Sequence, residues 1–295
     1  MPENEGQHLQ QTYPAARKLG GMQRYGFHAS AHMTELDPRF DTADVTGSLF
    51  RSWSRFWNVS KGNLLEKSPR HVTMTRFLQR AFGRNRSKFV LIMRHPLGAS
   101  HYHWNRGRRR AMRTTCGRSL IEHWLKVHDT FEEDASSLET VVGLHFEEYL
   151  NRSKHLAQVM TDQLFEQLRL EGSVELEFQE GAHAYDDQHD VEQHTNHSSE
   201  HRRMQLQQLL GRQQGARRRL LEYHGDRSHV QVRYGGVYSW VADWNRLTNN
   251  MQSAACQQLI EDKEDQLRRY GYSLKDLRWL GPPTPFTSFF LRPEV

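Results

Sequence analysis

An unbroken run of apolar residues from Phe89 to Met93 is followed at once by Arg94, His95 and Pro96. Such a run, ended by a cation and a proline, predicts a strand buried on both faces in a parallel sheet. Ligands of open parallel sheets bind just beyond the carboxyl ends of the strands. Arg94 is expected at such an end, and its planar guanidinium matches the geometry of a phosphate group.

The residues after this strand predict a helix whose first turn helps to form the same site. Pro96 suits the first helical position, where its fixed φ is favourable and no N–H is required. The free N–H groups of a helix N-terminus favour an anion, and Ser100 lies one turn further on. We therefore expect a phosphate pocket at Arg94, with His95 as a structural neighbour. The alternative is a strand-end arginine that pairs with a surface carboxylate.

Strand and helix patterns alternate along most of the chain. Extended segments are predicted at 63–69, 88–93 and 141–150, and apolar residues at helical spacing predict helices at 71–82, 119–134 and 253–269. This order is typical of an α/β fold with a parallel sheet and right-handed crossovers, in a single domain of residues 1–295. The polar stretch 179–201 contains five histidines without a fixed ligand spacing, which predicts a disordered insertion rather than a metal site.

A second predicted strand, 63–69, also ends in charged residues. Its sequence NLLEKSP places Glu66, Lys67 and Ser68 before Pro69. Two neighbouring strand ends that each carry a cation would attract a strongly anionic ligand.

The net charge is +5, and the excess positive charge is concentrated in one segment. Residues 106–118 contain six arginines, which predicts either a surface for polyanions or a solvated helix face. The chain lacks the stacking-aromatic motifs of the common RNA-binding modules, which argues against nucleic acid as the partner.

Other features bear on the compartment. No apolar run approaches the roughly 20 residues that span a bilayer, so no membrane segment is expected. Cys116 and Cys256 are far apart in the sequence and suggest neither a disulfide framework nor a zinc site. Asn-x-Ser sequons stand at Asn58, Asn85, Asn151 and Asn196, and they are a faint sign of a secretory lumen.

The segments LLEKSP, TRFLQRAF, KFVLIMRHP, EHWLKVH and GLHFEEYL, in this order and spacing, resemble the sulfotransferase family. The resemblance is to the carbohydrate and heparan-type enzymes and their plant and algal relatives, and it extends from about residue 3 to residue 275. It implies a P-loop-type parallel sheet flanked by helices and transfer of a sulfuryl group from 3′-phosphoadenylyl sulfate (PAPS) to a hydroxyl or amine. It also implies a carbohydrate or similar acceptor, the Golgi lumen as the compartment, and no metal.

The resemblance assigns a role to particular residues. Arg94 matches the arginine that holds the 3′-phosphate of PAPS, and Ser100 or Tyr102 would donate a hydroxyl hydrogen bond beside it. Lys67 matches the lysine close to the transferred sulfuryl group. ENEGQHLQ resembles the segment that carries the general base, with Glu5 as the matching carboxylate. Residues 233–247 correspond to a late loop over the nucleotide.

The glycine-containing loop that binds the 5′-phosphosulfate in this family has no counterpart in the chain. KLGGMQR has glycines and cations, but it follows the general-base segment and is predicted to be an ordinary loop. The first strand and the phosphate loop are therefore expected to be missing, which predicts reduced or absent activity for this chain. The alternative is a non-catalytic polyanion-binding protein on a degenerate sulfotransferase scaffold.

Overall fold

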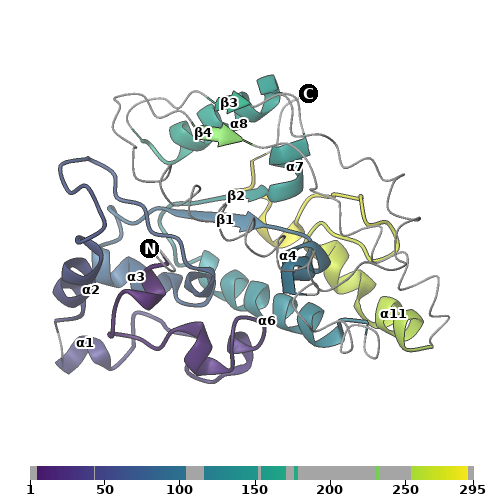
Figure 1. Cartoon of the computed structure of the whole chain (residues 1–295), viewed down its shortest axis with the longest axis horizontal. Coiled ribbons are helices and arrows are strands. Elements are labelled where there is room, and N and C mark those ends of the chain that lie inside the picture. Colours follow the sequence, from purple (N-terminus) through teal and green to yellow (C-terminus); the bar gives the residue numbers. More distant parts are fainter. Residues whose placement is uncertain are drawn as a thin grey trace, which may run out of the picture. The chain divides into compact units, whose positions relative to one another are not determined.

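The computed structural model describes residues 5–42, 44–103, 116–151, 154–170, 176–178, 230–232 and 254–291 (Figure 1). The chain divides into two compact units, Met1–Ser173 with Val237–Val295, and Val174–Gly236. Within the second unit, the short strands β3 (Leu176–Phe178) and β4 (Val230–Val232) pair in parallel. The predicted insertion at 179–201 lies outside the described residues.

The first unit contains a parallel pair of strands, as the apolar runs predict. Strand β1 (Phe89–Met93) pairs with β2 (Val141–His145), and Phe89 lies opposite Val141. A C-terminal segment extends the sheet on the far side of β2, where Gly143 N–H donates to Phe289 O and Leu291 N–H donates to Gly143 O. The fold is therefore a mixed α/β arrangement in which the described part of this sheet is narrow.

The described residues form helices α1 (Arg39–Thr42), α2 (Val45–Trp53), α3 (Thr75–Phe82), α4 (Pro96–His103), α6 (Arg118–Ala135), α7 (Phe146–Asn151), α8 (Lys154–Gln167) and α11 (Ala254–Arg269). Of these, α3, α6 and α11 correspond to the helices predicted at 71–82, 119–134 and 253–269, although α3 begins only at Thr75. Short 3-10 helices lie at Gly6–His8 (η1), Ala16–Leu19 (η2), Tyr25–Phe27 (η3), Pro69–Thr73 (η4) and Thr284–Phe286 (η6). Pro96 begins α4 as expected, and Gly20 ends η2 in the left-handed region, which confirms a loop in KLGGMQR.

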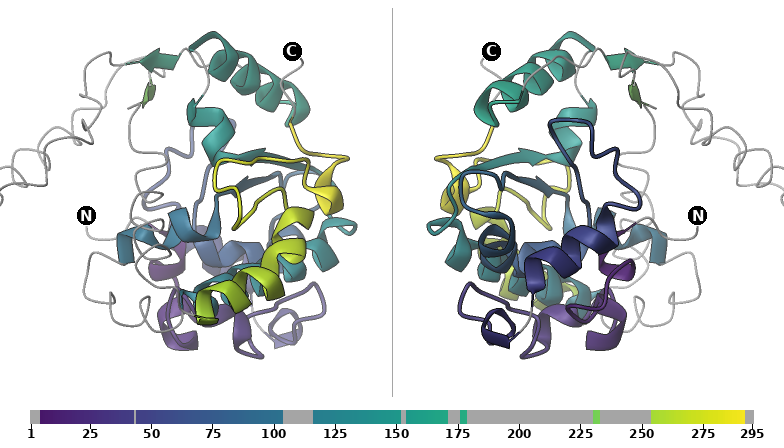
Figure 2. Two further views of the ribbon diagram at one scale, coloured as in Figure 1. Left: turned by 90° about the vertical axis from the view of Figure 1, so that its right-hand side faces the viewer. Right: turned by 90° about the vertical axis from the view of Figure 1, so that its left-hand side faces the viewer.

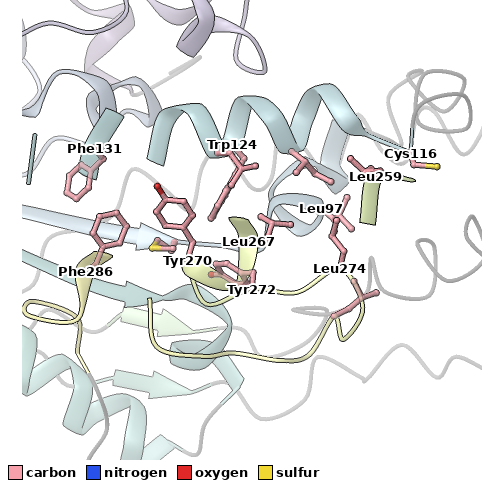
Figure 3. Packing of buried hydrophobic residues seen from close by; sticks show 14 of the residues in the cluster. Leu97, Cys116, Trp124, Phe131, Leu259, Leu267, Tyr270, Tyr272, Leu274 and Phe286 are labelled. Carbon is pink, nitrogen blue, oxygen red and sulfur yellow. The ribbon is translucent and has the colours of Figure 1, made fainter. Parts of the chain in front are cut away.

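One face of the sheet packs on α6 and α11 (Figure 2). The side chains of Leu91 and Met93 join a cluster that includes Ile121 and Leu125 of α6. Figure 3 shows Trp124, Tyr270 and Tyr272 beside one another in this cluster, with Trp124 ring centroids 5.6 and 5.7 Å from the two tyrosines. Burial of these large apolar side chains is the main favourable contribution to the stability of this layer.

The opposite face of the sheet is only partly covered. Val142 and Leu144 of β2 pack against Met160 and Leu168 in and after α8. Val90 and Ile92 of β1 lie on the same face, because alternate residues of a strand share a face, yet they are 38% and 56% exposed. The prediction that β1 is buried on both faces was therefore wrong.

The predicted strand at 63–69 is also absent from the structure. No residue of this described segment is in a strand or bridge, and Leu65 is 83% exposed. Its backbone is held by side chains instead, since Trp57 Nε1 donates to Leu65 O at 2.8 Å. The expectation of two adjacent strand ends, at Lys67 and at Arg94, therefore does not hold in that form.

The two cysteines, which suggested no disulfide framework, are joined to each other. Cys116 and Cys256 form a disulfide with a Cα–Cα distance of 5.4 Å, within the usual range for such bonds. Both residues belong to the cluster between α6 and α11. The long separation of 140 positions left no spacing pattern by which the pairing could be predicted.

In the part of the chain that the structure describes, we find no helix with the length and apolar character needed to cross a membrane.

Candidate functional site

Two residues predicted to be catalytic, Glu5 and Lys67, are in direct contact. Lys67 Nζ donates to Glu5 Oε1 at 2.9 Å, although the residues are 62 positions apart. The side chain of Glu5 is 25% exposed and that of Lys67 is 72% exposed. An ion pair this open to water contributes only about 0–1 kcal/mol to stability, and both groups are within reach of a ligand.

The carboxylate of Glu5 is held by the residues that follow it. Gln7 Nε2 donates to Glu5 Oε2 at 2.6 Å, and the buried Gln7 is fixed in turn because its N–H donates to Ser68 Oγ at 3.1 Å. Gly6 N–H donates to Glu66 Oε1 at 2.5 Å. Segments 5–8 and 66–71 are thus joined by several hydrogen bonds, which positions Glu5 opposite Lys67.

Gly6 is required for this close approach. A Cβ atom at position 6 would lie 2.4 Å from Glu66 Oε1, far inside van der Waals contact. Trp53 of α2 supports the same turn, because its Nε1 donates to Gly6 O at 3.0 Å.

Glu66 is the residue that organises this region, although the sequence pattern assigned it no individual role. Its Oε1 accepts hydrogen bonds from Gly6 N–H and from Ser68 Oγ, and its Oε2 lies 2.5 Å from His71 Nδ1. Burial alone would raise the pKa of Glu66, but the contacts with His71, Ser68 and Gly6 outweigh it and leave the pKa lowered. A buried carboxylate therefore stays ionised beside Glu5. Its place directly before Lys67 in the motif was a signal that could have identified it.

The network extends inward to a tyrosine. His71 Nε2 lies 2.7 Å from Tyr13 OH, and the Tyr13 ring packs against Phe77 in a buried cluster. Burial and the nearby Glu66 raise the pKa of Tyr13 above its ordinary value. The Tyr13–His71–Glu66 chain anchors the surface pair to the hydrophobic core.

Arg94 stands at the carboxyl end of β1, as predicted. Its guanidinium lies over the ring of Phe146, 4.7 Å from the centroid, and its Nε is buried without a hydrogen-bond partner among the described residues. Burial lowers the pKa of Arg94, while Glu147 and Tyr272 oppose that shift. The Arg94 cation is therefore partly removed from water and incompletely hydrogen-bonded within the described residues.

His95 is a structural residue, as predicted. It is buried, its Nε2 contacts Ser273 O at 3.1 Å, and its Nδ1 accepts from Leu97 N–H at 3.2 Å. Burial lowers its pKa to about 4, so the ring is neutral at physiological pH. Its backbone N–H donates to Glu147 Oε1 at 2.8 Å, which fixes the turn between β1 and α4.

Glu147 lies in the first turn of α7, and its side chain is buried. Its carboxylate accepts a hydrogen bond from His95 N–H, and Tyr272 OH donates to its other oxygen at 3.1 Å. Burial raises the pKa of Glu147, although these hydrogen bonds and Arg94 act in the opposite direction. Glu147 therefore joins β1, β2 and the segment after α11 around Arg94.

The remaining predicted site residues lie wholly or partly outside the described part of the structure. Ser100 and Tyr102 belong to α4, but their side chains are not among those described. Residues 233–247 and most of the arginine-rich segment also lie outside the described residues. Of its six arginines, Arg118 is described, and it pairs with Asp262 at 2.8 Å and with Glu122 at 3.7 Å.

The structure does not join the two halves of the predicted site by direct contact. Within the described ranges, no hydrogen bond or ion pair links Arg94 to Glu5 or to Lys67. A shared cleft for one nucleotide therefore stays a prediction. Among these same residues, no group of three or more His, Cys, Asp or Glu side chains is arranged to hold a metal ion.

Comparisons with protein-family models, with curated proteins and with solved structures found no match to this chain.

Proposed function

We propose that the chain has the fold and active-site residues of a PAPS-dependent sulfotransferase with a P-loop-type sheet. The observation that carries the proposal is the contact between Glu5 and Lys67, at 2.9 Å. At this contact Glu5 supplies a carboxylate that can accept a proton, and Lys67 supplies a cation that can bind an anionic group. The partly buried Arg94, at a parallel strand end, supports the proposal as a separate anion contact.

The reaction would be an in-line displacement at sulfur. The oxygen of the acceptor hydroxyl forms a bond to sulfur, and the bond between sulfur and the bridging oxygen of PAPS breaks. Glu5 takes the proton of the hydroxyl, which requires a separation of about 3 Å. Adenosine 3′,5′-bisphosphate leaves with the negative charge. The protein contributes mainly position and electrostatic stabilisation to such a transfer.

Lys67 would stabilise the charge that develops on the transferred group. In the absence of substrate its ammonium neutralises Glu5, and binding of the donor would draw the ammonium toward the sulfate oxygens. Glu5 would then be free to act as a base. Because Gln7 also binds Glu5, the carboxylate keeps its position when Lys67 moves.

Arg94 would hold the 3′-phosphate of the donor. Its guanidinium lies at the end of β1, partly removed from water, and would pair there with the phosphate charge. A bidentate contact to phosphate is stronger than one between neutral groups, because both partners are charged. A hydroxyl of Ser100 or Tyr102 would complete this contact from α4.

We further propose that the acceptor is a carbohydrate or a similar hydroxyl compound and that the reaction takes place in the Golgi lumen. The disulfide between Cys116 and Cys256 supports an oxidising compartment. Because the sequence contains no identified phosphosulfate loop, we expect a low turnover.

Binding to immobilised adenosine 3′,5′-bisphosphate tests the proposal without requiring turnover. The wild-type chain should be retained, and Arg94→Ala should be lost. Arg84→Ala is the matched control, because Arg84 is an exposed arginine that pairs with Glu139 at 3.2 Å. Equal retention of the wild type and Arg94→Ala would overturn the nucleotide assignment.

A parallel heparin column distinguishes the proposed nucleotide-binding enzyme from the alternative, a non-catalytic binder of polyanions. That alternative predicts retention on heparin that survives Arg94→Ala, with no retention on the nucleotide column. It would place the function in the arginines of 106–118 rather than at the end of β1.

A further inference from the structure

We propose that Asn58 is a site of N-linked glycosylation, and that the chain matures in an oxidising secretory lumen where this modification occurs. Two independent observations point to it: the geometry of the sequon at Asn58 and the disulfide between Cys116 and Cys256. The proposal stands whether or not the chain transfers sulfuryl groups.

The first observation is the conformation of Asn58, Val59 and Ser60. All three residues are exposed in the loop between α2 and η4. Ser60 Oγ donates to Asn58 Oδ1 at 2.7 Å, and Ser60 N–H donates to the same oxygen at 3.2 Å. Both donors withdraw electron density from the carboxamide, while Nδ2, the atom that would be modified, makes no hydrogen bond to any described residue.

The loop also leaves space for a bulky polar group. Lys61 N–H donates to Asn58 O at 3.0 Å, so the turn is closed by its own backbone. The neighbouring Val59 is more than half exposed, and no described element packs over the turn. A glycan attached at Asn58 would therefore extend into solvent without displacing a packed side chain.

A second sequon on the described surface lacks this arrangement. Asn85 is exposed in the turn between α3 and β1, but Ser87 Oγ is buried and has no hydrogen-bond partner among the described residues. In the sequon at Asn58, the hydroxyl of Ser60 is hydrogen-bonded to its asparagine. In the sequon at Asn85, the hydroxyl of Ser87 is buried and makes no such bond. This contrast favours Asn58. The side chains of Asn151 and Asn196 are not among those described.

The second observation is the disulfide. Disulfides form and persist in oxidising compartments and are rare where thiols are kept reduced. Cys116 and Cys256 are both buried, at 2% and 3% exposure, so that the bond is a structural one, protected from solvent reductants. The compartment that forms such a bond is also the one in which asparagine-linked glycans are added.

The modification joins Asn58 to a sugar supplied by a lipid pyrophosphate-linked oligosaccharide. Nδ2 forms a bond to C1 of the first N-acetylhexosamine, and the bond between C1 and the pyrophosphate oxygen breaks. Nδ2 loses one proton, and the lipid pyrophosphate departs. The transferase of the lumen carries out this step, so nothing is required of the chain beyond an accessible acceptor.

Peptide mapping of the chain, purified from its own cells, tests the proposal. Enzymatic deglycosylation in heavy-oxygen water converts a glycosylated asparagine into a labelled aspartate. We expect label at Asn58 and a linked Cys116–Cys256 peptide before reduction. An unlabelled Asn58 would overturn the proposal, whatever the state of the cysteines.

Sequon variants expressed in the same cells provide the controls. Ser60→Ala should abolish the glycan at Asn58, Ser60→Thr should retain it, and Asn85→Gln should leave it unchanged. Because Ser60 is exposed, these variants are expected to fold. Label that persists at Asn58 in Ser60→Ala would exclude sequon-dependent glycosylation and overturn the proposal.

Discussion

Lys67 Nζ lies 2.9 Å from Glu5 Oε1, and among the described residues the pair is anchored on the carboxylate side, through Gln7 and Glu66. The ammonium is largely exposed, whereas the carboxylate is tied to a buried network. The carboxylate of Glu5 is therefore the fixed member of the pair, and the ammonium of Lys67 is the member that is open to solvent.

Replacing either member of this pair should remove function without unfolding the protein. For Glu5→Gln and Lys67→Met, we expect the free energy of unfolding to change by no more than about 1 kcal/mol, because exposed ion pairs contribute little. Whatever sulfuryl transfer from labelled PAPS the wild type shows should be lost in both variants. Arg84→Met, which breaks the exposed pair with Glu139, is the control and should affect neither urea unfolding nor transfer. A loss of several kcal/mol in Lys67→Met would instead indicate a structural role.

Gly6 should be intolerant of any side chain. In Gly6→Ala the new methyl group would meet Glu66 Oε1, and we expect a loss of about 1–3 kcal/mol, typical of overpacking. Gly62→Ala is a matched control from the same region, since nothing lies within 4 Å of the place that its methyl group would take. Urea unfolding of the two variants measures the difference. Equal stability would show that the segment at 5–8 is not held against Glu66.

Arg94 should matter more for binding than for stability. Its guanidinium is partly desolvated and incompletely bonded, so Arg94→Met removes an unfavourable burial along with the contact to Phe146. We expect the unfolding free energy to stay within about 1 kcal/mol of the wild type, while retention on the nucleotide column is lost. An arginine kept for structure would give the reverse result, with lower stability and unchanged retention.

Acid should destabilise the protein through its buried neutral histidines. Burial lowers the pKa of His95, His123, His128 and His145 to about 4, from 6.5. The unfolded chain therefore binds more protons between these values, and stability falls as the pH is lowered from 6.5 toward 4. Each histidine contributes a slope of up to about 1.4 kcal/mol per pH unit. The raised pKa of Glu147 acts in the opposite sense, because the folded state holds that proton more tightly.

His123→Gln isolates one of these contributions. His123 Nε2 accepts from Gly26 N–H at 3.1 Å, and a glutamine oxygen can accept the same bond without titrating. Urea unfolding at several pH values should show a shallower slope for this variant. An unaltered slope in His123→Gln would contradict the assignment of a neutral buried ring.

Removing the disulfide should weaken the fold strongly. A crosslink across 140 positions restricts the unfolded chain, and the chain-entropy model gives on the order of 4–5 kcal/mol for a loop of this size. Cys116→Ser with Cys256→Ser should therefore unfold at lower urea concentration than the oxidised wild type. Reductant present during urea unfolding, when the bond becomes exposed, should lower the unfolding midpoint of the wild type and leave the double variant unchanged. Equal midpoints for the wild type unfolded with and without reductant would contradict the bond.

The sequence predicted the helices better than the sheet. Helical spacing of apolar residues located α3, α6 and α11 because each helix buries one continuous stripe on its neighbours. The apolar run of β1 identified a strand, but it could not reveal how much of each face is covered. The burial of each face depends on which other elements pack against it. On this face α8 packs against Val142 and Leu144 of β2, whereas Ile92 of β1 stays exposed.

The candidate site was predicted by residue type but not by its supporting contacts. The motif residues Glu5 and Lys67 meet, yet the short apolar segment before Lys67 is a side-chain-supported loop rather than a strand. Two leucines in a row were insufficient evidence, since Leu65 is mostly in water. Glu66 and Tyr13 matter because of contacts made across the fold, and such contacts leave no periodic signal in a single sequence.

The bond between Cys116 and Cys256 has a consequence for how the chain responds to proteases. Any cleavage between these residues yields two fragments that remain covalently attached. Such a nicked molecule would migrate as one species on a non-reducing gel and separate into two only after reduction. The segments that carry α6 and α11 would thus stay linked after proteolysis of the long connection between them.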